Sequence, residues 1–294
     1  AYLLGLPRDG IYEAMEVLTI ARLANAIGAV GVARKAYLEA YYFAQRRESF
    51  GKKLIEHPLI QKDLLEMEIE IEANLIFLMK AIESFNRSWQ SRPPYDEKYF
   101  YTRLLGHIVK NMTADMSARV TQLAMELHGG NGFMEDFPVA RWHREALVTP
   151  IWEGGSNIQA LDMLEVMIKK QAHLILFDEL QKILEQHPDN VSTPVVKAEL
   201  DNIRSEVDKM LKMSQPEVQY FVKELLNKLG KLTTAVFLIN ADEFTLQQAN
   251  DNRFHILNNL YQKKYIRNVA LDLSDIQRGL PIIDIQKELI PESI

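Results

Sequence analysis

Residues 149–159 of the chain, TPIWEGGSNIQ, contain the side chain best suited to acid–base chemistry in this sequence. Glu153 follows the indole of Trp152 and precedes two glycines. An aromatic wall that keeps water away raises the pKa of a carboxyl group toward the range of a general base. A helix expected to begin at Ser156 or Asn157 favours the ionised form through its N-terminal dipole. Glu153 is therefore a candidate base, and the alternative is a solvent-exposed acid that only faces a helix N-terminus.

The corner between two expected helices, residues 41–61, offers groups that can hold a phosphate. Arg47 provides a cationic fork of donors, and Ser49 can donate a hydrogen bond. Phe50 can stack on a flat ring, and His57 adds an imidazole. The same residue types also fit a solvated turn with one anchoring aromatic, and residue types alone favour that alternative.

Glycines gather on both sides of the loop that precedes the candidate base. Residues 126–159 contain five of the 13 glycines of the chain. Gly129 can be explained as the end of a helix, where a left-handed residue is common. Two pairs of glycines at the two ends of one loop indicate more, because a backbone without Cβ admits a ligand closely. Arg141 and Arg144, inside this loop, are expected to pair with neighbouring carboxylates.

The elements that must position these groups are expected to be helices. Apolar residues recur every three or four positions, with breaks at proline and glycine. The stretch EMEIEIE at 66–72 alternates like a strand, but it lies between strong helix formers and is expected to be helical. An irregular segment is expected at 129–155, and helices are predicted over about 11–44, 58–89, 96–127, 156–186, 195–213, 216–249 and 252–274, with a short terminal helix. We predict an all-α fold with one helical unit at 1–170 and an appended one at 171–294.

Composition disfavours several classes of protein. The 294 residues carry a net charge of −6, and both helical units are net negative, unlike a nucleic-acid binder. Binding of nucleic acid through the basic residues at 46–53 is therefore a minor alternative. No apolar run reaches the roughly 18 residues that span a bilayer, and the first residues lack a signal-peptide pattern. The absence of cysteine excludes disulfides and fits a cytoplasmic location, and the histidines show no metal-ligand spacing, so no metal site is expected.

The two chemically suggestive stretches resemble the C-terminal helical domain of the acyl-CoA dehydrogenase family. RRESFGKKLIEHPLIQ at 46–61 is similar to the family's R-x-x-F-G-x-x-L…Q signature. LHGGNGFMEDFPVARWHREA, followed by IWEGGSNIQ, is similar to its G-G-x-G-[FY]…P…R…R-[DE] and [YW]-E-G-[TS]-x-x-I segments. The resemblance covers about residues 10–170 and implies a four-helix bundle. The sequence around Glu153 and the extra C-terminal helices look closest to the adaptive-response and isovaleryl-like subfamily.

The resemblance implies flavin chemistry. Family members bind FAD, desaturate an acyl-CoA thioester in fatty-acid β-oxidation and pass electrons to an electron-transfer flavoprotein. Glu153 matches the base that removes the α-proton while a β-hydride goes to FAD, and its backbone N–H matches a donor to the thioester oxygen. Arg22 and Gly154 match the acyl-CoA side. The positions that match cofactor contacts, partly supplied by a neighbouring subunit, are Arg47, Ser49, Phe50, His57, Ile60, Glu126, Gly129, Gly130, Trp152, Gly155 and Asn157.

The chain also departs from the family pattern. Glu126 stands where many members carry Gln, which places an acid near the diphosphate, and Gly155 replaces a usual Thr or Ser. The family's N-terminal helical domain and middle β-domain are not part of this sequence, so we expect an incomplete enzyme that needs them. A homo-oligomer, either a dimer or a tetramer, is expected, and no membrane partner. The alternatives are a non-catalytic helical assembly module and a DNA-associated member of the subfamily.

Overall fold

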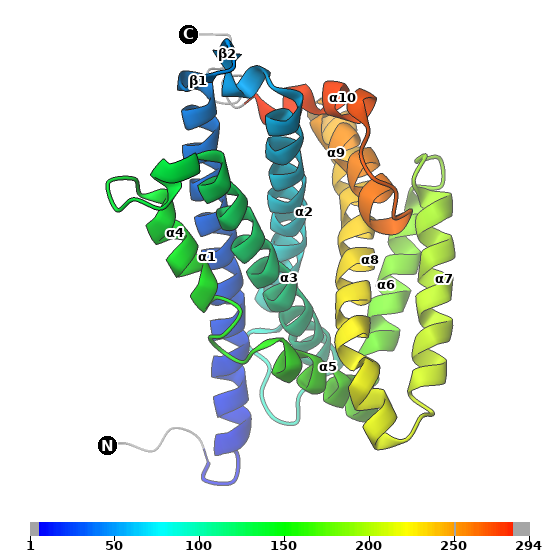
Figure 1. The fold of residues 1–294 in the computed structure, drawn as a ribbon. Helices are drawn as coiled ribbons and strands as arrows, with labels where there is room; N and C mark the ends of the chain where they lie inside the picture. Colours follow the sequence, from blue (N-terminus) through cyan, green and yellow to red (C-terminus); the bar gives the residue numbers. More distant parts are fainter. Residues whose placement is uncertain (1–5, 250, 285–294) are drawn as a thin grey trace.

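Three long helices form the frame that carries both candidate groups. The computed structural model describes residues 6–249 and 251–284. Helices α1 (Gly10–Arg46), α2 (Pro58–Ser88) and α3 (Glu97–Leu127) pack against one another (Figure 1). The starts of α2 and α3 follow from local chemistry, because a proline occupies the first turn of α2 and the Asp96 carboxylate accepts a hydrogen bond from Tyr99 N at 3.0 Å. These three helices confirm the prediction, including the helical assignment of 66–72.

The segment predicted to be irregular, 129–155, is partly helical, so that prediction was wrong. It contains a 3-10 turn (Gly129–Gly132) and the helix α4 (Val139–Val148). Val139 and Ala146 are fully buried where α4 packs on α1 and α3. A helix of 10 residues with two buried positions is too short to show the periodic apolar pattern on which the prediction relied.

The long helix predicted at 156–186 is two helices in the structure. Helices α5 (Ser156–Lys170) and α6 (Ala172–Gln186) meet at Gln171, whose φ of 53° is left-handed. Gln171 N donates to Met167 O at 3.0 Å and so closes α5. The predicted N-caps of α5 were also wrong, because Gly155 holds that position and no side chain caps the helix.

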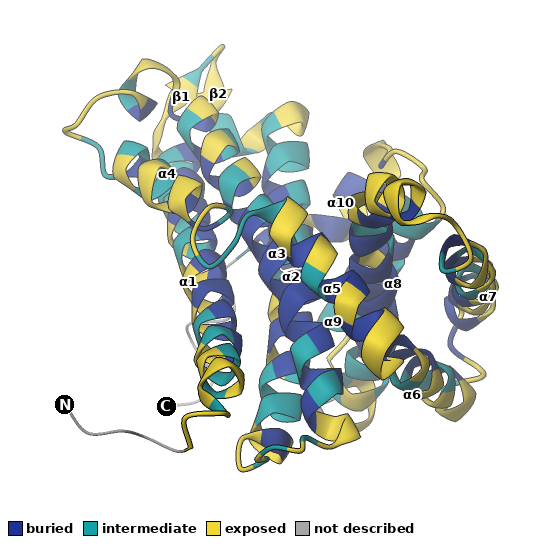
Figure 2. Ribbon diagram, turned by 90° about the horizontal axis from the view of Figure 1, so that it is seen from below, coloured by how far each residue is buried: buried dark blue, intermediate teal, exposed yellow. Residues whose placement is uncertain are grey.

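The remaining helices pack against the frame through α8, α9 and α10. They are α7 (Thr193–Met210), α8 (Gln215–Ala249), α9 (Arg253–Tyr261), a π-helical turn (Gln262–Ile266) and α10 (Leu273–Ile283). The prediction of one helix over 252–274 was wrong, since the chain leaves helical geometry after the π-helical turn and a new helix, α10, begins at Leu273. Helix α8 contacts α2, α3 and α5, and Figure 2 shows buried residues on the inner faces of both regions. The all-α prediction is confirmed, and one apolar core extends through the bundle and the appended helices.

A buried ion-pair network connects the last helices to the bundle. Glu68 on α2 has no exposed surface and accepts hydrogen bonds from Arg34 of α1 and from Arg253 of α9, the latter at 3.1 Å. Arg253 also pairs with Glu72 and donates to Ile282 O at 3.1 Å. Burial and the neighbouring Glu72 carboxylate raise the pKa of Glu68 to about 8, and the two guanidinium groups oppose this rise. The network therefore ties α9 and α10 to α1 and α2 at one acidic side chain.

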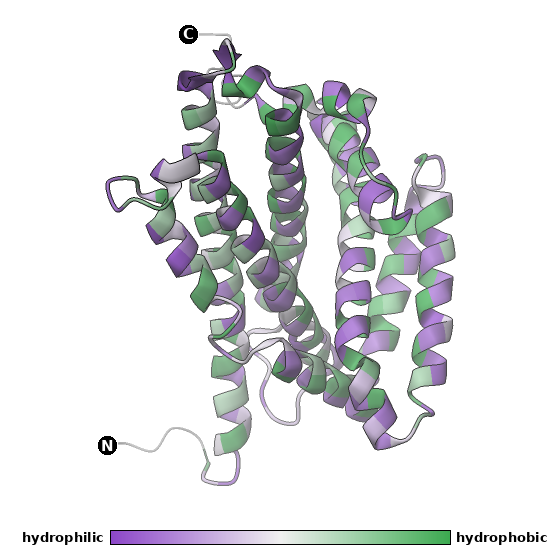
Figure 3. Cartoon of the chain, in the orientation of Figure 1, coloured by the Kyte–Doolittle hydropathy of each residue, from purple (hydrophilic) through white to green (hydrophobic). Residues whose placement is uncertain are grey.

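Helix α1 is long and apolar enough to cross a membrane by length and composition alone, although no span was predicted. Figure 3 shows much of this helix in the hydrophobic colours. Within the bundle, Ala26, Ala33 and Tyr37 on this helix have no exposed surface, and Arg34 pairs with Glu68. A helix that packs against two neighbours has the same composition, so the hydropathy is weak evidence for a membrane span.

Candidate functional site

Glu153 lies on a strained turn between α4 and α5. Its φ of 58° is left-handed, a conformation that costs a residue with a Cβ about 1–2 kcal/mol. The next residue, Gly154, has a φ of 94°, and a Cβ there would lie 3.0 Å from Gln159 Nε2 and 3.0 Å from the Cγ2 methyl of Ile158. The turn therefore requires this glycine. Strain of this kind persists only where surrounding contacts fix the conformation.

Buried polar side chains from α1 and α3 supply part of those contacts. Asn25 Nδ2 donates to Thr149 O at 2.8 Å. Lys110 Nζ donates to Gly154 O at 2.7 Å and reaches Pro150 O at 3.4 Å. Asn25 is 5% exposed and Lys110 is 1% exposed, so water cannot readily replace these donors.

A pair of side chains from α3 and α5 holds the centre of the turn. Gln159 Nε2 donates to Glu153 O at 2.8 Å and to Gly154 O at 3.0 Å. His107 Nδ1 lies 3.0 Å from Gln159 Oε1, and because an amide oxygen can only accept, the imidazole is the donor. Burial lowers the pKa of His107 well below 6.5, so the ring is neutral. The carbonyls of the turn are thus held inward, while Glu153 N–H makes no hydrogen bond within the described residues.

Arg22 lies under the same turn. It is 3% exposed, and its NH2 donates to Asp162 Oδ2 at 2.8 Å. Its Nε and NH1 are buried without a hydrogen-bond partner among the described residues. Burial lowers the pKa of Arg22, and the carboxylate of Asp162 and, less strongly, that of Glu153 oppose this effect. Burial, and after it the charge of Arg22, lower the pKa of Lys110 to about 8. The structure therefore brings two buried cations to the candidate base, and contact of Arg22 with acyl-CoA stays a prediction.

The predicted aromatic wall does not enclose Glu153 within this chain. Trp152 is 49% exposed, and Glu153 itself is half-buried. Asn157 is exposed, and Gly155 is half-buried at the start of α5. Ile151 is 73% exposed beside them, so the surface around the turn is apolar and open. The expected exclusion of water from Glu153 is therefore incomplete within this chain, because both Glu153 and the neighbouring Trp152 are partly exposed.

The second predicted group forms a cavity at the C-terminal end of α1. The cavity has a volume of about 540 Å³ and lies between the ends of α1 and α3 and the start of α2. Gly129, with a φ of 59°, and Gly130 leave one wall without Cβ atoms and with open space beside it. Six of the predicted cofactor positions line this cavity: Arg47, Ser49, Ile60, Glu126, Gly129 and Gly130.

Phe50 lies in a small hairpin beside the cavity, which the sequence did not predict, and His57 contacts this hairpin from the start of α2. Strands β1 (Glu48–Ser49) and β2 (Lys52–Lys53) are antiparallel, and Phe50 has a left-handed φ of 51° in the turn between them. Phe50 is 95% exposed, and His57 Nε2 donates to Ser49 O at 3.0 Å. Phe50 is thus presented outward on the hairpin, while His57 fixes the hairpin to the start of α2.

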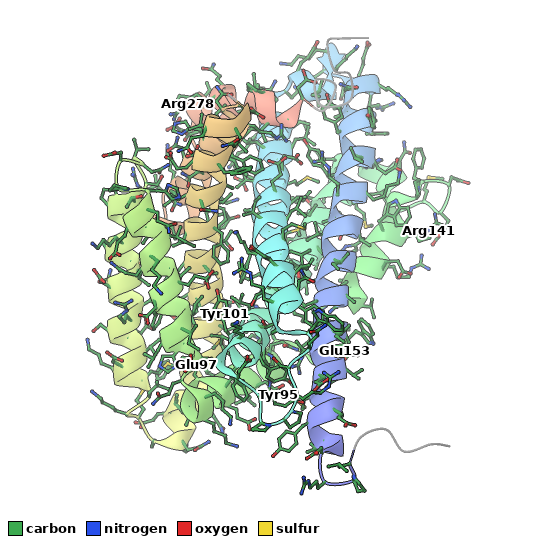
Figure 4. The ribbon with its side chains drawn as sticks, turned by 180° about the vertical axis from the view of Figure 1, so that it is seen from behind. Tyr95, Glu97, Tyr101, Arg141, Glu153 and Arg278 are labelled. Atoms are coloured by element: carbon green, nitrogen blue, oxygen red, sulfur yellow. The ribbon has the colours of Figure 1, made fainter. Side chains whose placement is uncertain are left out.

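The candidate base and the cavity are far apart in one chain. Arg47 follows the end of α1, whereas Asn25, which holds the Glu153 turn, lies 22 positions earlier. At a rise of 1.5 Å per residue, this separation is about 33 Å along the helix. Figure 4 shows Glu153 beside the lower half of α1, and the hairpin is at the upper end. The two predicted groups are therefore not one site within a single chain.

The two arginines of the 129–155 segment have different partners. Arg144 NH2 pairs with Glu135 Oε1 at 2.9 Å, as predicted. The Arg141 guanidinium lies 5.0 Å from the centroid of the Trp142 ring, so its expected carboxylate pairing is replaced by a cation–π contact. Figure 4 shows Arg141 on the outer side of α4, away from Glu153.

Comparison with known proteins identifies the fold that carries these groups. The family model described as acyl-CoA dehydrogenase, C-terminal domain, matches residues 8–168. The chain belongs to the acyl-CoA dehydrogenase family. AidB of Escherichia coli, which carries an acyl-CoA dehydrogenase name, is 32% identical over 178 residues, or 60% of this chain and 32% of AidB. Acyl-CoA dehydrogenase family member 11 of Caenorhabditis elegans is 28% identical over 76% of this chain and 33% of its own length. The chain therefore spans about a third of the length of these relatives.

Solved structures share the architecture, including the appended helices. The apo form of Bd2924 is 28% identical and covers 80% of this chain and 44% of its own, with a TM-score of 0.68. The structure of ACDH-11 of C. elegans covers 87% of this chain and 44% of its own, with a TM-score of 0.74 at 21% identity. Both likenesses extend beyond residue 168, so the fold of this family member continues into its tail.

The sequence did not reveal the polar residues that hold the turn of this acyl-CoA dehydrogenase family member. Asn25, His107, Lys110 and Gln159 all lie on helices that were expected to bury apolar faces. One signal was available, because His107 and Lys110 interrupt the run LLGHIVKNM three residues apart and so share one helix face. A basic pair on a buried face indicates a fixed partner, since unpaired burial of polar groups is costly.

Proposed function

We propose that this chain is the C-terminal helical part of a flavin-dependent acyl-CoA dehydrogenase. In this proposal Glu153 removes the α-proton of an acyl-CoA thioester. FAD, when bound, accepts the β-hydride. The observation that supports it best is the turn itself: its carbonyls are held inward by buried donors, whereas Glu153 N–H and the half-buried carboxylate are left available.

The free Glu153 N–H supports the proposed chemistry directly. Removing a proton next to a thioester carbonyl develops negative charge on that oxygen, and a fixed backbone donor stabilises the charge. The neighbouring Lys110 and Arg22 add positive potential at the same place. A base and an oxyanion donor on one residue require that its backbone conformation be fixed, and the hydrogen bonds of the turn do this.

The cavity at the end of α1 fits the phosphate and adenosine part of FAD. Arg47 can supply a forked cation and Ser49 a hydroxyl donor, and Gly129 and Gly130 leave room for a ligand beside the backbone. Two lining carboxylates, Glu126 and Asp63, oppose an anion, and that of Glu126 accepts from Gln122 Nε2 at 3.1 Å. The donor set is therefore suited to a diphosphate, with two acidic side chains in the lining that repel it.

The separation of about 33 Å supports a homo-oligomer. Because the cavity lies at the C-terminal end of α1 and the Glu153 turn lies near the middle of that helix, one extended cofactor is expected to use the cavity of one copy and the turn of another. The exposed apolar residues Ile151 and Trp152 then need a covering surface, which we assign to the flavin-binding and substrate-binding domains of the family.

The names of relatives suggest the partners. ACDH-11 was solved in complex with C11-CoA, and an acyl-CoA dehydrogenase of Bacillus anthracis was solved with FAD. A relative from Acetobacterium woodii, 26% identical, is named a caffeyl-CoA reductase–Etf complex subunit. An acyl-CoA substrate, FAD and an electron-transfer flavoprotein are accordingly the proposed partners of the complete enzyme, with fatty-acid β-oxidation as the proposed setting.

Replacement of Glu153 by Gln tests the proposal. In the protein joined to its flavin-binding domains, flavin bleaching by butyryl-CoA and longer acyl-CoA thioesters is followed anaerobically in a stopped-flow instrument. Loss of a general base is expected to slow bleaching by about 10²–10⁴-fold with flavin still bound. Glu145→Gln, an exposed acid on α4, is the matched control and is expected to leave the rate unchanged.

A non-catalytic assembly module is the second candidate, and the Glu126 carboxylate beside the cavity favours it. That candidate predicts no stoichiometric flavin in the complete protein and no bleaching by any acyl-CoA. The 294-residue chain alone is expected to lose FAD on gel filtration under either candidate, so retention of stoichiometric FAD that acyl-CoA bleaches would contradict our view that further domains complete the site.

A further inference from the structure

Among the described residues, the buried ammonium of Lys110 donates hydrogen bonds only to the turn that carries Glu153. Its Nζ donates to Gly154 O at 2.7 Å and to Pro150 O at 3.4 Å, and no ion pair within 4.0 Å involves it among the described residues. A lysine on a buried helix face is normally retained only where its charge is used, because an apolar residue would pack there without desolvation cost. Lys110 therefore directs its hydrogen bonds to two backbone carbonyls of one turn.

Those two carbonyls flank the strained residue. Pro150 precedes Glu153 by three residues, and Gly154 follows it directly. Holding both ends from one side restricts rotation about the backbone of the residues between them, so the left-handed φ of 58° at Glu153 is kept. Gln159, oriented by His107, performs the same task from α5 by binding Glu153 O and Gly154 O.

We propose that Lys110 is a positioning residue that holds the Pro150–Gly154 turn, so that the carboxylate and the N–H of Glu153 face the substrate side together. This inference rests on the proposed function for its catalytic consequence. Its structural part, the dependence of the turn on Lys110, stands without it. Lys110 acts through Glu153 and does not itself contact substrate.

The structural part is tested in the 294-residue chain by amide hydrogen exchange over residues 149–158. Ile151 N and Trp152 N donate to Val148 O at 3.0 and 2.9 Å, so their exchange reports opening of the turn. Lys110→Met is expected to speed exchange there about tenfold or more, while Lys110→Arg, which keeps charge and donors, is expected to restore part of the protection. Thr113→Val is the matched control, because its hydroxyl is fully buried on the same helix but bonds only the carbonyls of its own turn, Val109 O and Lys110 O.

The catalytic part is tested in the flavin-loaded protein with butyryl-CoA. A displacement of about 1 Å in a positioned group can cost about 10²-fold in rate, so Lys110→Met is expected to slow flavin bleaching by about 10–100-fold. The apparent dissociation constant for butyryl-CoA and the flavin content are expected to stay within about twofold of the unsubstituted protein. A merely structural lysine would lower the melting temperature and the flavin content but would leave the bleaching rate per bound flavin unchanged.

A second variant guards against misfolding of Lys110→Met. Gln159→Leu removes the donors to Glu153 O and Gly154 O from α5 and is expected to give the same pattern of exchange and rate. Unchanged exchange over 149–158 in folded Lys110→Met overturns the proposal, as does an unchanged bleaching rate. If the unsubstituted holoprotein is not bleached by any acyl-CoA, the proposed function fails while the exchange result still decides whether Lys110 holds the turn.

Discussion

The buried acid Glu68 provides a quantitative test of how the appended helices are held to the bundle. Its side chain has no exposed surface, and the pKa is raised from 4.5 to about 8 by burial and by Glu72. Folding then binds a proton between pH 4.5 and 8, so stability is greatest at the acidic end and falls as pH rises through that window. At 1.36 kcal/mol per pKa unit, the loss amounts to at most about 5 kcal/mol.

Glu68→Gln should remove this pH dependence. Oε1 of Glu68 accepts hydrogen bonds from Arg34 and Arg253, and Oε2 has no partner among the described residues. The amide oxygen of a Gln can therefore keep the contacts with the two arginines, and its NH2 group can take the place of the protonated Oε2. We expect the variant to match the unsubstituted chain within about 1 kcal/mol at pH 5 and to exceed it by about 2–5 kcal/mol at pH 9. Glu83→Gln, a half-exposed position on the same helix, is the control and should change stability by less than about 1 kcal/mol.

Urea unfolding followed by circular dichroism at pH 5, 7 and 9 measures these differences. If Glu68 is instead held ionised by its two arginines, removal of one partner of a buried ion pair should destabilise the chain by about 3–5 kcal/mol at every pH. Parallel curves displaced in that direction would falsify the assignment of a protonated Glu68 and would show that the attraction of the guanidinium groups outweighs desolvation.

Two further substitutions test the cavity at the end of α1. A Cβ at Gly132 would lie 2.2 Å from Met125 O, so Gly132→Ala should destabilise the chain by about 1–3 kcal/mol in thermal unfolding. Gly130→Ala is the control and should not destabilise it, because a Cβ at Gly130 would meet nothing within 4 Å. Equal melting temperatures of the two variants would contradict the close approach of the two backbone segments. Glu126→Gln removes a negative charge from the exposed rim of the cavity, so FAD should bind the complete protein up to about fivefold more tightly. A fluorescence titration at low salt measures this affinity. Weaker binding would show that Glu126 serves the cofactor as a hydrogen-bond acceptor.

The long helices could be predicted from sequence because each repeats its apolar pattern over many turns. Helix α4 could not, since only Val139 and Ala146 are buried in it. The break at Gln171 also gave no signal, because a left-handed residue that is neither glycine nor asparagine looks like any other polar helix position. Tertiary packing fixes both features, and a local pattern does not contain that information.

The site was predictable in its parts and not in its arrangement. Arg47, Ser49 and Gly129 were selected from local motifs, and the structure places them around one cavity. Their distance from Glu153 could not be inferred from those motifs, because it depends on the full length of α1. The partial exposure of Trp152 was missed for a related reason: adjacency in sequence does not show whether an indole covers the next side chain when that next residue is left-handed.

Helix α5 connects the turn that carries Glu153 to the appended helices. It starts at the residue after Gly155, beside the candidate base, and ends at Lys170, directly before the tail. Its 15 residues make a rod of about 22 Å, and α6 and α8 of the tail both pack against it. A molecule that docked on the tail and tilted this rod would move the candidate base mechanically, without touching flavin or thioester. The appended helices are thus in contact with the helix that follows the Glu153 turn.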